Sequence, residues 1–138
     1  MSGIYIHIPF CKQACHYCDF HFSTNLAKKE PILQALKKEL VLRKAELANE
    51  TIATIYFGGG TPSVMSVSEI DDLLTTVREH YTVVNVPEIT LEANPDDLTK
   101  SKIQDLAASK VNRLSIGIQS FFEEDLKLMN RAHTVDQA

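Results

Sequence analysis

The sequence predicts an α/β fold built from parallel βα units. Segments rich in β-branched and aromatic residues alternate four times with segments whose apolar residues recur at helical spacing. This alternation favours a parallel sheet whose strands are joined by right-handed helical crossovers. The composition agrees with a globular domain, because 44% of the 138 residues are hydrophobic and 23% are charged.

The first βα unit begins with Ile-Tyr-Ile-His-Ile at residues 4–8, a strand pattern that stops at Pro9. A loop holding all three cysteines follows. A helix is then expected over about residues 29–49, because apolar residues recur there at helical spacing. They are Ile32, Leu36, Leu40 and Leu47.

The second unit begins with a strand at residues 54–57, which leads into Gly-Gly-Gly-Thr-Pro at residues 58–62. Ser66 and Glu69 then have the spacing of a capping box, in which each side chain accepts from a backbone N–H of the other residue. The apolar stripe over residues 70–81 predicts the helix that this box begins.

The third and fourth units follow the same order. A strand is predicted at residues 88–93, Thr99 is placed to cap a helix, and residues 103–107 carry the apolar positions of that helix. Residues 113–118 form the fourth predicted strand and residues 123–129 a short last helix.

Four special segments follow the four strands: the cysteine loop, the triple glycine, Glu92-Ala-Asn-Pro95 and Gln119-Ser120. In parallel α/β sheets the functional loops lie at the carboxyl ends of the strands. We therefore expect these segments to converge on one edge of the sheet.

The charge balance argues against several classes of protein. Lys and Arg number 14 against 18 Asp and Glu, for a net charge of −4, which lacks the basic surface of a nucleic-acid binder. No apolar run approaches the roughly 18 residues of a membrane span. The first residues show no signal peptide, so we expect a cytoplasmic protein.

The last residues suggest more chain. Thr134 and Gln137 have capping-box spacing, as if a helix began there, but the sequence ends at Ala138. Four βα units cannot close a barrel and would leave the last strand edge exposed. We expect residues 1–138 to be the N-terminal part of a longer polypeptide.

The cysteines lie in the pattern C-x3-C-x2-C at Cys11, Cys15 and Cys18. Thiolates are soft ligands, and three of them can hold three irons of a cubane while the fourth iron stays open. One alternative is a zinc site with His21 as the fourth ligand, and another is three unligated thiols. The crowding of the cysteines into one loop favours the iron–sulfur cluster.

This cysteine pattern after a first strand resembles the signature of the radical S-adenosylmethionine (SAM) enzymes. The surrounding segments resemble the oxygen-independent coproporphyrinogen III oxidase family, in the order of that family. They are Tyr-Ile-His-Ile-Pro-Phe-Cys at 5–11, Phe-Gly-Gly-Gly-Thr-Pro at 57–62, Leu-Glu-Ala-Asn-Pro at 91–95, Leu-Ser-Ile-Gly-Ile-Gln-Ser at 114–120 and Leu-Met-Asn-Arg-Ala-His at 128–133.

The resemblance implies a partial TIM-type barrel, of which residues 1–138 would be the N-terminal portion; the rest of the barrel and a C-terminal domain are expected outside these residues. It also implies a [4Fe–4S] cluster and bound SAM. By resemblance, the cluster ligands are Cys11, Cys15 and Cys18. The SAM contacts implied in the same way are Tyr5, Tyr17, Gly60, Thr61, Glu92, Gln119 and Arg131.

Two departures from the oxidase pattern point to a sister branch of the family. Phe20 stands where the oxidase carries a fourth cysteine, and the oxidase's extension before the first strand is not seen. Both features resemble the HemW-type heme chaperones, which bind heme and deliver it to respiratory proteins. An electron donor and a membrane-bound heme acceptor would then be partners.

Two other functions stay open at this point. The first is the oxidase itself, which converts propionates of coproporphyrinogen III to vinyl groups through a 5′-deoxyadenosyl radical; reductive SAM cleavage is expected here, but Phe20 does not favour the oxidase reaction. The second is a zinc-stabilised α/β binding domain without redox chemistry.

Overall fold

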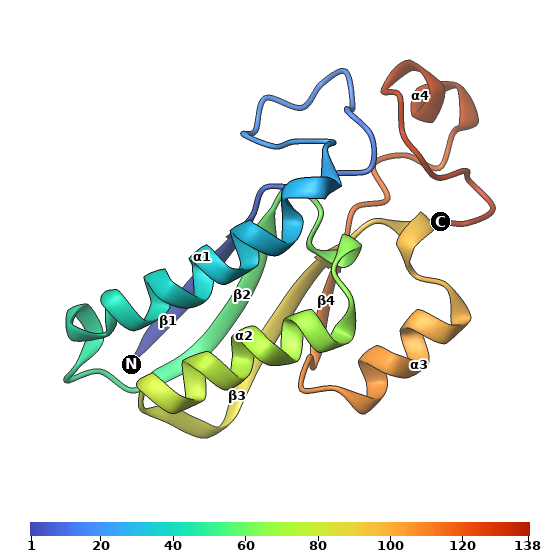
Figure 1. Ribbon diagram of the computed structural model, residues 1–138. Helices are drawn as coiled ribbons and strands as arrows, with labels where there is room; N and C mark the ends of the chain where they lie inside the picture. Colours follow the sequence, from blue (N-terminus) through green and yellow to red (C-terminus); the bar gives the residue numbers. More distant parts are fainter.

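The computed structural model describes all residues from 1 to 138 and contains a four-stranded parallel sheet in the order β1-β2-β3-β4 (Figure 1). The strands are β1 (Ser2–Ile8), β2 (Ile52–Gly59), β3 (Val83–Ala93) and β4 (Arg113–Ile116). The helices are α1 (Lys29–Leu42), α2 (Val67–His80), α3 (Lys100–Ala108) and α4 (Glu123–Leu128). Short 3-10 turns are η1 (Leu26–Lys28), η2 (Lys44–Leu47), η3 (Pro62–Val64) and η4 (Pro95–Asp97). The predicted α/β fold class and the parallel pairing of the strands are confirmed.

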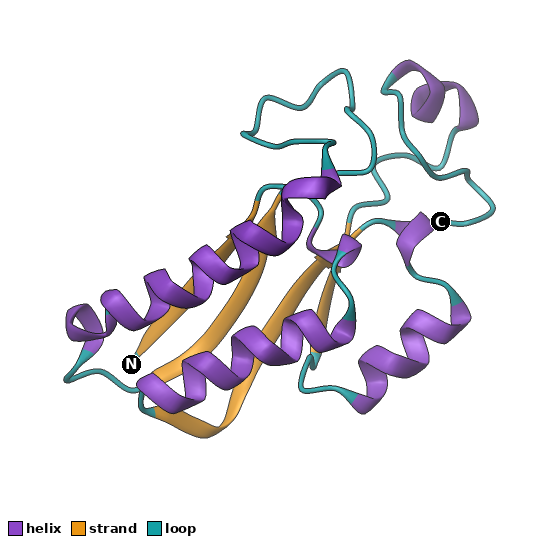
Figure 2. Ribbon diagram, viewed as in Figure 1, coloured by secondary structure: helices purple, strands orange, loops and turns teal.

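One face of the sheet forms the core. Helices α1 and α2 lie across this face (Figure 2), and Leu106 of α3 joins the same apolar cluster. Side chains alternate along a strand, so Phe57 of β2 and Leu91 of β3 both point to the helices, and both are fully buried. Burying each such side chain contributes roughly 1.5–3 kcal/mol.

The opposite face of the sheet carries polar and aromatic side chains. The parallel register pairs Tyr5 of β1 with Tyr56 of β2 and Glu92 of β3 with Ser115 of β4. Because paired residues of a parallel sheet share a face, the period-2 pattern separates this polar set from the apolar core.

The capping box at the start of α2 is confirmed. The Glu69 N–H donates to Ser66 Oγ at 3.2 Å, and the Ser66 N–H donates to Glu69 Oε2 at 2.7 Å. Lys29 of α1 also pairs with Glu69, at 2.9 Å. Burial favours the neutral form of Glu69, but the bonds from the Ser66 backbone and from Lys29 outweigh it, so the pKa of Glu69 lies below its usual value. This carboxylate therefore joins α1 to α2.

The largest differences from the predicted bounds lie near the amino ends of the strands. The helix expected over residues 29–49 ends at Leu42, because Arg43 leaves helical geometry at φ −90° and ψ 2° and the chain continues as η2. Strand β3 begins at Val83 rather than at residue 88. Its interior Pro87 cannot donate to the sheet, and the register of β2 against β3 shifts between Ile52 and Thr54.

Strand β4 is shorter than predicted and ends at Ile116 instead of residue 118. The Gly117 N–H still donates to the Ala93 carbonyl oxygen at 2.9 Å, but Gln119 adopts a positive φ of 69° and turns the chain away. This turn brings residues 117–119 over the end of the sheet.

None of the helices has the length and apolar character that crossing a membrane requires.

Candidate functional site

A cavity of about 280 Å³ lies at the carboxyl edge of the sheet, where the sequence places the four special segments. Its walls come from the cysteine loop, the glycine turn after β2, the ends of β3 and β4, and the chain after α4. Nine residues of the expected site line it together: Cys11, Cys15, Cys18, Tyr17, Gly60, Thr61, Glu92, Gln119 and Arg131. The predicted convergence on one edge is confirmed.

The cysteine loop presents all three thiols to this cavity. Cys11 is buried, whereas Cys15 and Cys18 are half-buried and no disulfide joins them. The loop is closed at its base, because the Cys11 N–H donates to the Ser23 carbonyl oxygen at 3.1 Å. Burial raises the pKa of the Cys11 thiol, and a hydrogen bond from Thr61 opposes that rise.

The thiols surround the cavity rather than meeting at one point. No three His, Cys, Asp or Glu side chains converge as the ligands of a single metal ion would. In a cubane each thiolate holds a different iron, so three thiols around a common space suit its geometry. His21, the fourth ligand of the zinc alternative, is exposed and does not line the cavity.

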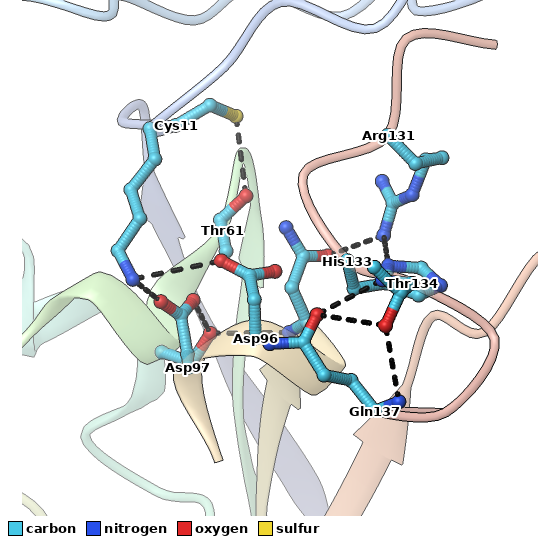
Figure 3. A network of polar contacts seen from close by, with 11 residues as sticks. Cys11, Thr61, Asp96, Asp97, Arg131, His133, Thr134 and Gln137 are labelled. Carbon is cyan, nitrogen blue, oxygen red and sulfur yellow. Dashed lines mark hydrogen bonds and ion pairs between the residues drawn. The ribbon is translucent and has the colours of Figure 1, made fainter. Parts of the chain in front are cut away.

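The glycine turn packs directly against the cysteine loop. The Gly60 N–H donates to the Ile8 carbonyl oxygen at 2.8 Å, and the Thr61 N–H donates to the Phe10 carbonyl oxygen at 2.7 Å. A Cβ on Gly60 would lie 2.6 Å from that same Phe10 oxygen, so only glycine allows this approach. The Thr61 hydroxyl then donates to Cys11 Sγ at 3.3 Å (Figure 3).

Arg131 connects the cysteine loop to the far wall of the cavity. Its Nη1 donates to Cys15 Sγ at 3.3 Å and to the Tyr17 hydroxyl at 3.4 Å. Its Nη2 donates to Asn94 Oδ1 at 2.8 Å and to the Gly117 carbonyl oxygen at 2.9 Å. The buried Nε has no partner. A fixed guanidinium with an unused donor suits an anionic ligand group such as a carboxylate.

His133 contacts the guanidinium of Arg131. It is buried, and its Nε2 donates to the Ile118 carbonyl oxygen at 3.0 Å, which leaves Nδ1 as the acceptor facing Arg131 Nη2 at 3.5 Å (Figure 3). His133 is the last residue of the 128–133 segment that resembles the family, and the sequence assigns it no role in the site. Its contacts instead join the turn after β4 to the arginine of the site.

Glu92 and Tyr5 meet through a residue that sequence analysis does not single out. The Tyr56 hydroxyl donates to Glu92 Oε1 at 2.6 Å, and that bond to Glu92 raises the pKa of Tyr56. Tyr5 stacks on Tyr56 with ring centroids 5.9 Å apart and the planes 19° from parallel. Tyr5 itself does not line the cavity, so of the ten expected site residues it alone lies outside the wall.

Three further residues of the site have only weak signals in the sequence. Asn94 follows β3 at its carboxyl end, the position that favours a functional role, and it fixes Arg131. Gln13 and Asn130 are hydrogen-bonded to each other although they lie 117 positions apart in the sequence. No pattern in the sequence links two residues so far apart.

A parallel α/β sheet with three thiols and a glycine turn at its carboxyl edge is the arrangement that the resemblance to the radical SAM enzymes predicts. The family model described as the Radical SAM superfamily matches residues 5–138, and the chain belongs to this superfamily. Membership implies a [4Fe–4S] cluster and SAM. The thiols around one cavity and the unused donor of Arg131 fit these two groups.

Individual proteins within the superfamily show further similarity to this chain. The heme chaperone HemW of Lactococcus lactis is 43% identical over 133 residues, which cover 96% of this chain and 34% of HemW. The heme chaperone HemW of Escherichia coli is 39% identical over 138 residues, with 99% and 36% covered. The structure of the E. coli coproporphyrinogen III oxidase HemN, a radical SAM enzyme, superposes with a TM-score of 0.87 at 31% identity, covering 98% of this chain and 32% of HemN.

These similarities confirm the resemblance to the family of the oxidase and the HemW chaperones. The chain spans about one third of the length of each of these relatives. The four βα units therefore correspond to a partial segment of a radical SAM barrel.

Proposed function

We propose that this protein binds a [4Fe–4S] cluster through Cys11, Cys15 and Cys18 and SAM in the adjoining cavity, and that it serves as a heme chaperone. The observation that carries the proposal is the shared cavity, which is lined by all three thiols together with the residues expected to contact SAM. Similarity to the HemW chaperones over 96% and 99% of this chain supports the choice of branch.

Each side chain then has a defined task. The three thiolates hold the cluster, and Thr61 stabilises the Cys11 thiolate by donating a hydrogen bond to it. Arg131 offers its guanidinium to the SAM carboxylate, while Glu92 is oriented by Tyr56 to accept a hydrogen bond from SAM. When bound, the reduced cluster supplies one electron for the reductive cleavage of SAM.

Gly60 and Thr61 bind the glycine turn to the segment before the cysteine loop and form part of the cavity wall. Phe20 also lines the cavity although 71% of its surface is exposed. It occupies the position at which the oxidase carries a further cysteine, so no fourth thiol is available in the loop. Heme binding belongs to the same proposal and is supported by the similarity to the HemW heme chaperones. An electron donor and a membrane-bound heme acceptor are proposed with it, from the resemblance to that branch of the family.

The oxidase is the second candidate, and the structural similarity to HemN favours it. It would use the same cluster and SAM site but decarboxylate coproporphyrinogen III. Phe20 argues for the chaperone, because the oxidase pattern has cysteine at that position.

Anaerobic reconstitution of the full-length protein with iron and sulfide tests the cluster. We expect a brown protein with a broad visible absorption band, lost in Cys15→Ser and kept in His21→Ala. A colourless protein that takes up one zinc ion and loses it in His21→Ala would support the zinc alternative and overturn the proposal.

A paired assay then separates the two tetrapyrrole functions. Heme titration of the reconstituted protein should give a saturable change in the heme spectrum, and incubation with coproporphyrinogen III, SAM and a reductant should leave the propionates intact. Formation of vinyl groups without saturable heme binding would assign the oxidase function instead.

A further inference from the structure

The cysteine loop is fastened to a turn that lies more than a hundred residues away in the sequence. Gln13 Nε2 donates to the Asn130 carbonyl oxygen at 2.8 Å and to Asn130 Oδ1 at 2.9 Å. Asn130 Nδ2 donates in return to the Ala14 carbonyl oxygen at 2.8 Å. The two amide side chains thus satisfy each other and the backbone on both sides. Figure 1 places the cysteine loop, in blue, and the red α4 at the same end of the sheet.

The neighbouring residues extend this attachment. The His16 N–H donates to the Met129 carbonyl oxygen at 3.0 Å, and His16 Nδ1 donates to the Leu128 carbonyl oxygen at 3.0 Å. Together with the bond from Arg131 to Cys15, residues 13–16 are held one after another by residues 128–131. Within residues 11–18 themselves, the Cys18 N–H to the Cys15 carbonyl oxygen is the one internal backbone bond. The shape of the loop is therefore imposed from outside.

The backbone conformation at Asn130 explains how this residue can hold the cysteine loop in place. Asn130 has φ +55°, the left-handed conformation that asparagine tolerates better than most residues. Its N–H donates to the Lys127 carbonyl oxygen at 3.0 Å, and the Arg131 N–H donates to the Leu126 carbonyl oxygen at 2.9 Å. These two bonds form a Schellman motif at the end of α4. The motif fixes the direction in which Arg131 leaves the helix.

We propose that Asn130 is a positioning residue for the cluster site: it locks the cysteine loop onto the end of α4 and so sets Cys15 against Arg131. This inference rests on the proposed cluster at Cys11, Cys15 and Cys18. Asn130 does not line the cavity, so it acts through Gln13 and the loop backbone.

Asn130→Gly gives the sharpest test in the full-length, reconstituted protein. Glycine keeps the left-handed backbone of the Schellman motif but removes both side-chain bonds to the loop. The loop then opens more often, and we expect iron to be released to a chelator roughly ten-fold faster, followed as loss of visible absorption. Asn130→Asp keeps the acceptor for Gln13 and should give an intermediate rate.

Asn112→Gly is the matched control. Asn112 also bridges backbone groups with its side chain, since its Nδ2 donates to the Pro87 carbonyl oxygen and its Oδ1 accepts from the Ile89 N–H, but at the opposite end of the sheet. We expect this variant to lower the Tm while iron release stays at the wild-type rate. Electron paramagnetic resonance of the reduced cluster adds a second readout, with a changed signal in Asn130→Gly and the wild-type signal in Asn112→Gly.

The outcomes separate the inference from the proposed function. If the wild-type protein takes up no cluster, the proposed function fails. If the wild-type cluster forms but Asn130→Gly releases iron at the wild-type rate, or no faster than Asn112→Gly, the positioning role is wrong and the proposed function stands.

Discussion

Replacing Gly60 by alanine places a methyl group against backbone atoms that cannot move independently. The added Cβ would lie 2.6 Å from the Phe10 carbonyl oxygen, 2.9 Å from the Phe10 nitrogen and 3.0 Å from the Ile8 carbonyl oxygen. Both of these carbonyl oxygens accept the hydrogen bonds that join the glycine turn to the cysteine loop. Moving the glycine turn away from the Ile8–Phe10 segment costs about 1–3 kcal/mol for overpacking and about 1 kcal/mol for each weakened hydrogen bond.

We therefore expect Gly60→Ala to lower the free energy of unfolding by about 3–5 kcal/mol and the Tm by roughly 10–20 °C. Thermal unfolding followed by circular dichroism measures this change. Gly58→Ala is the control, because the nearest atoms to its Cβ belong to the side chains of Tyr5 and Tyr56, and the Tyr5 ring, which is 57% exposed, can move outward at the cost of its stacking on Tyr56. Equal losses of Tm in the two variants would refute the close backbone approach at Gly60.

Three further substitutions test separate contacts. Tyr56→Phe removes the hydroxyl that orients Glu92, so SAM affinity in equilibrium dialysis should fall about five-fold at an unchanged Tm; unchanged affinity would contradict the orienting bond. Lys12→Met removes the ammonium paired with buried Asp97, which should cost about 1–2 kcal/mol in denaturant unfolding, and adding Asp97→Asn should recover part of that loss. The pKa of Glu69 is lowered in the fold, so its ionised form stabilises the protein above pH 4.5, and this stabilisation disappears as the pH falls through the folded pKa; Glu69→Gln should flatten the acid side of the Tm–pH profile, and an unchanged profile would disprove the linkage.

The sequence predicts well those elements that depend only on residues close to one another in the chain. The cap of α2 and the cap of α3 by Thr99 need only neighbouring residues, and both form as expected. The reciprocal bonds between Thr134 and Gln137 also form. The carboxyl-edge site follows from the βα alternation, because parallel strands bring their following loops together.

The remaining features depend on particular side-chain geometry or on contacts between distant parts of the chain. The break after α1 is stabilised by Arg43, whose guanidinium donates to Glu39 in the helix and Glu46 beyond it, a geometry that apolar spacing does not encode. The pairing of Gln13 with Asn130 arises only when the whole sheet has formed. Tyr56 belongs to an ordinary strand pattern, and its bond to Glu92 depends on the register of β2 against β3.

The attachment of the cysteine loop to the end of α4 also has a consequence for biosynthesis. The thiols leave the ribosome more than a hundred residues before the groups that hold residues 13–16 in place. A nascent chain that ends before Leu128 lacks every one of those bonds. The cysteine loop thus acquires its final shape only after all four strands have been translated, so the site of the proposed cluster is complete after the synthesis of α4 rather than after that of the cysteines themselves.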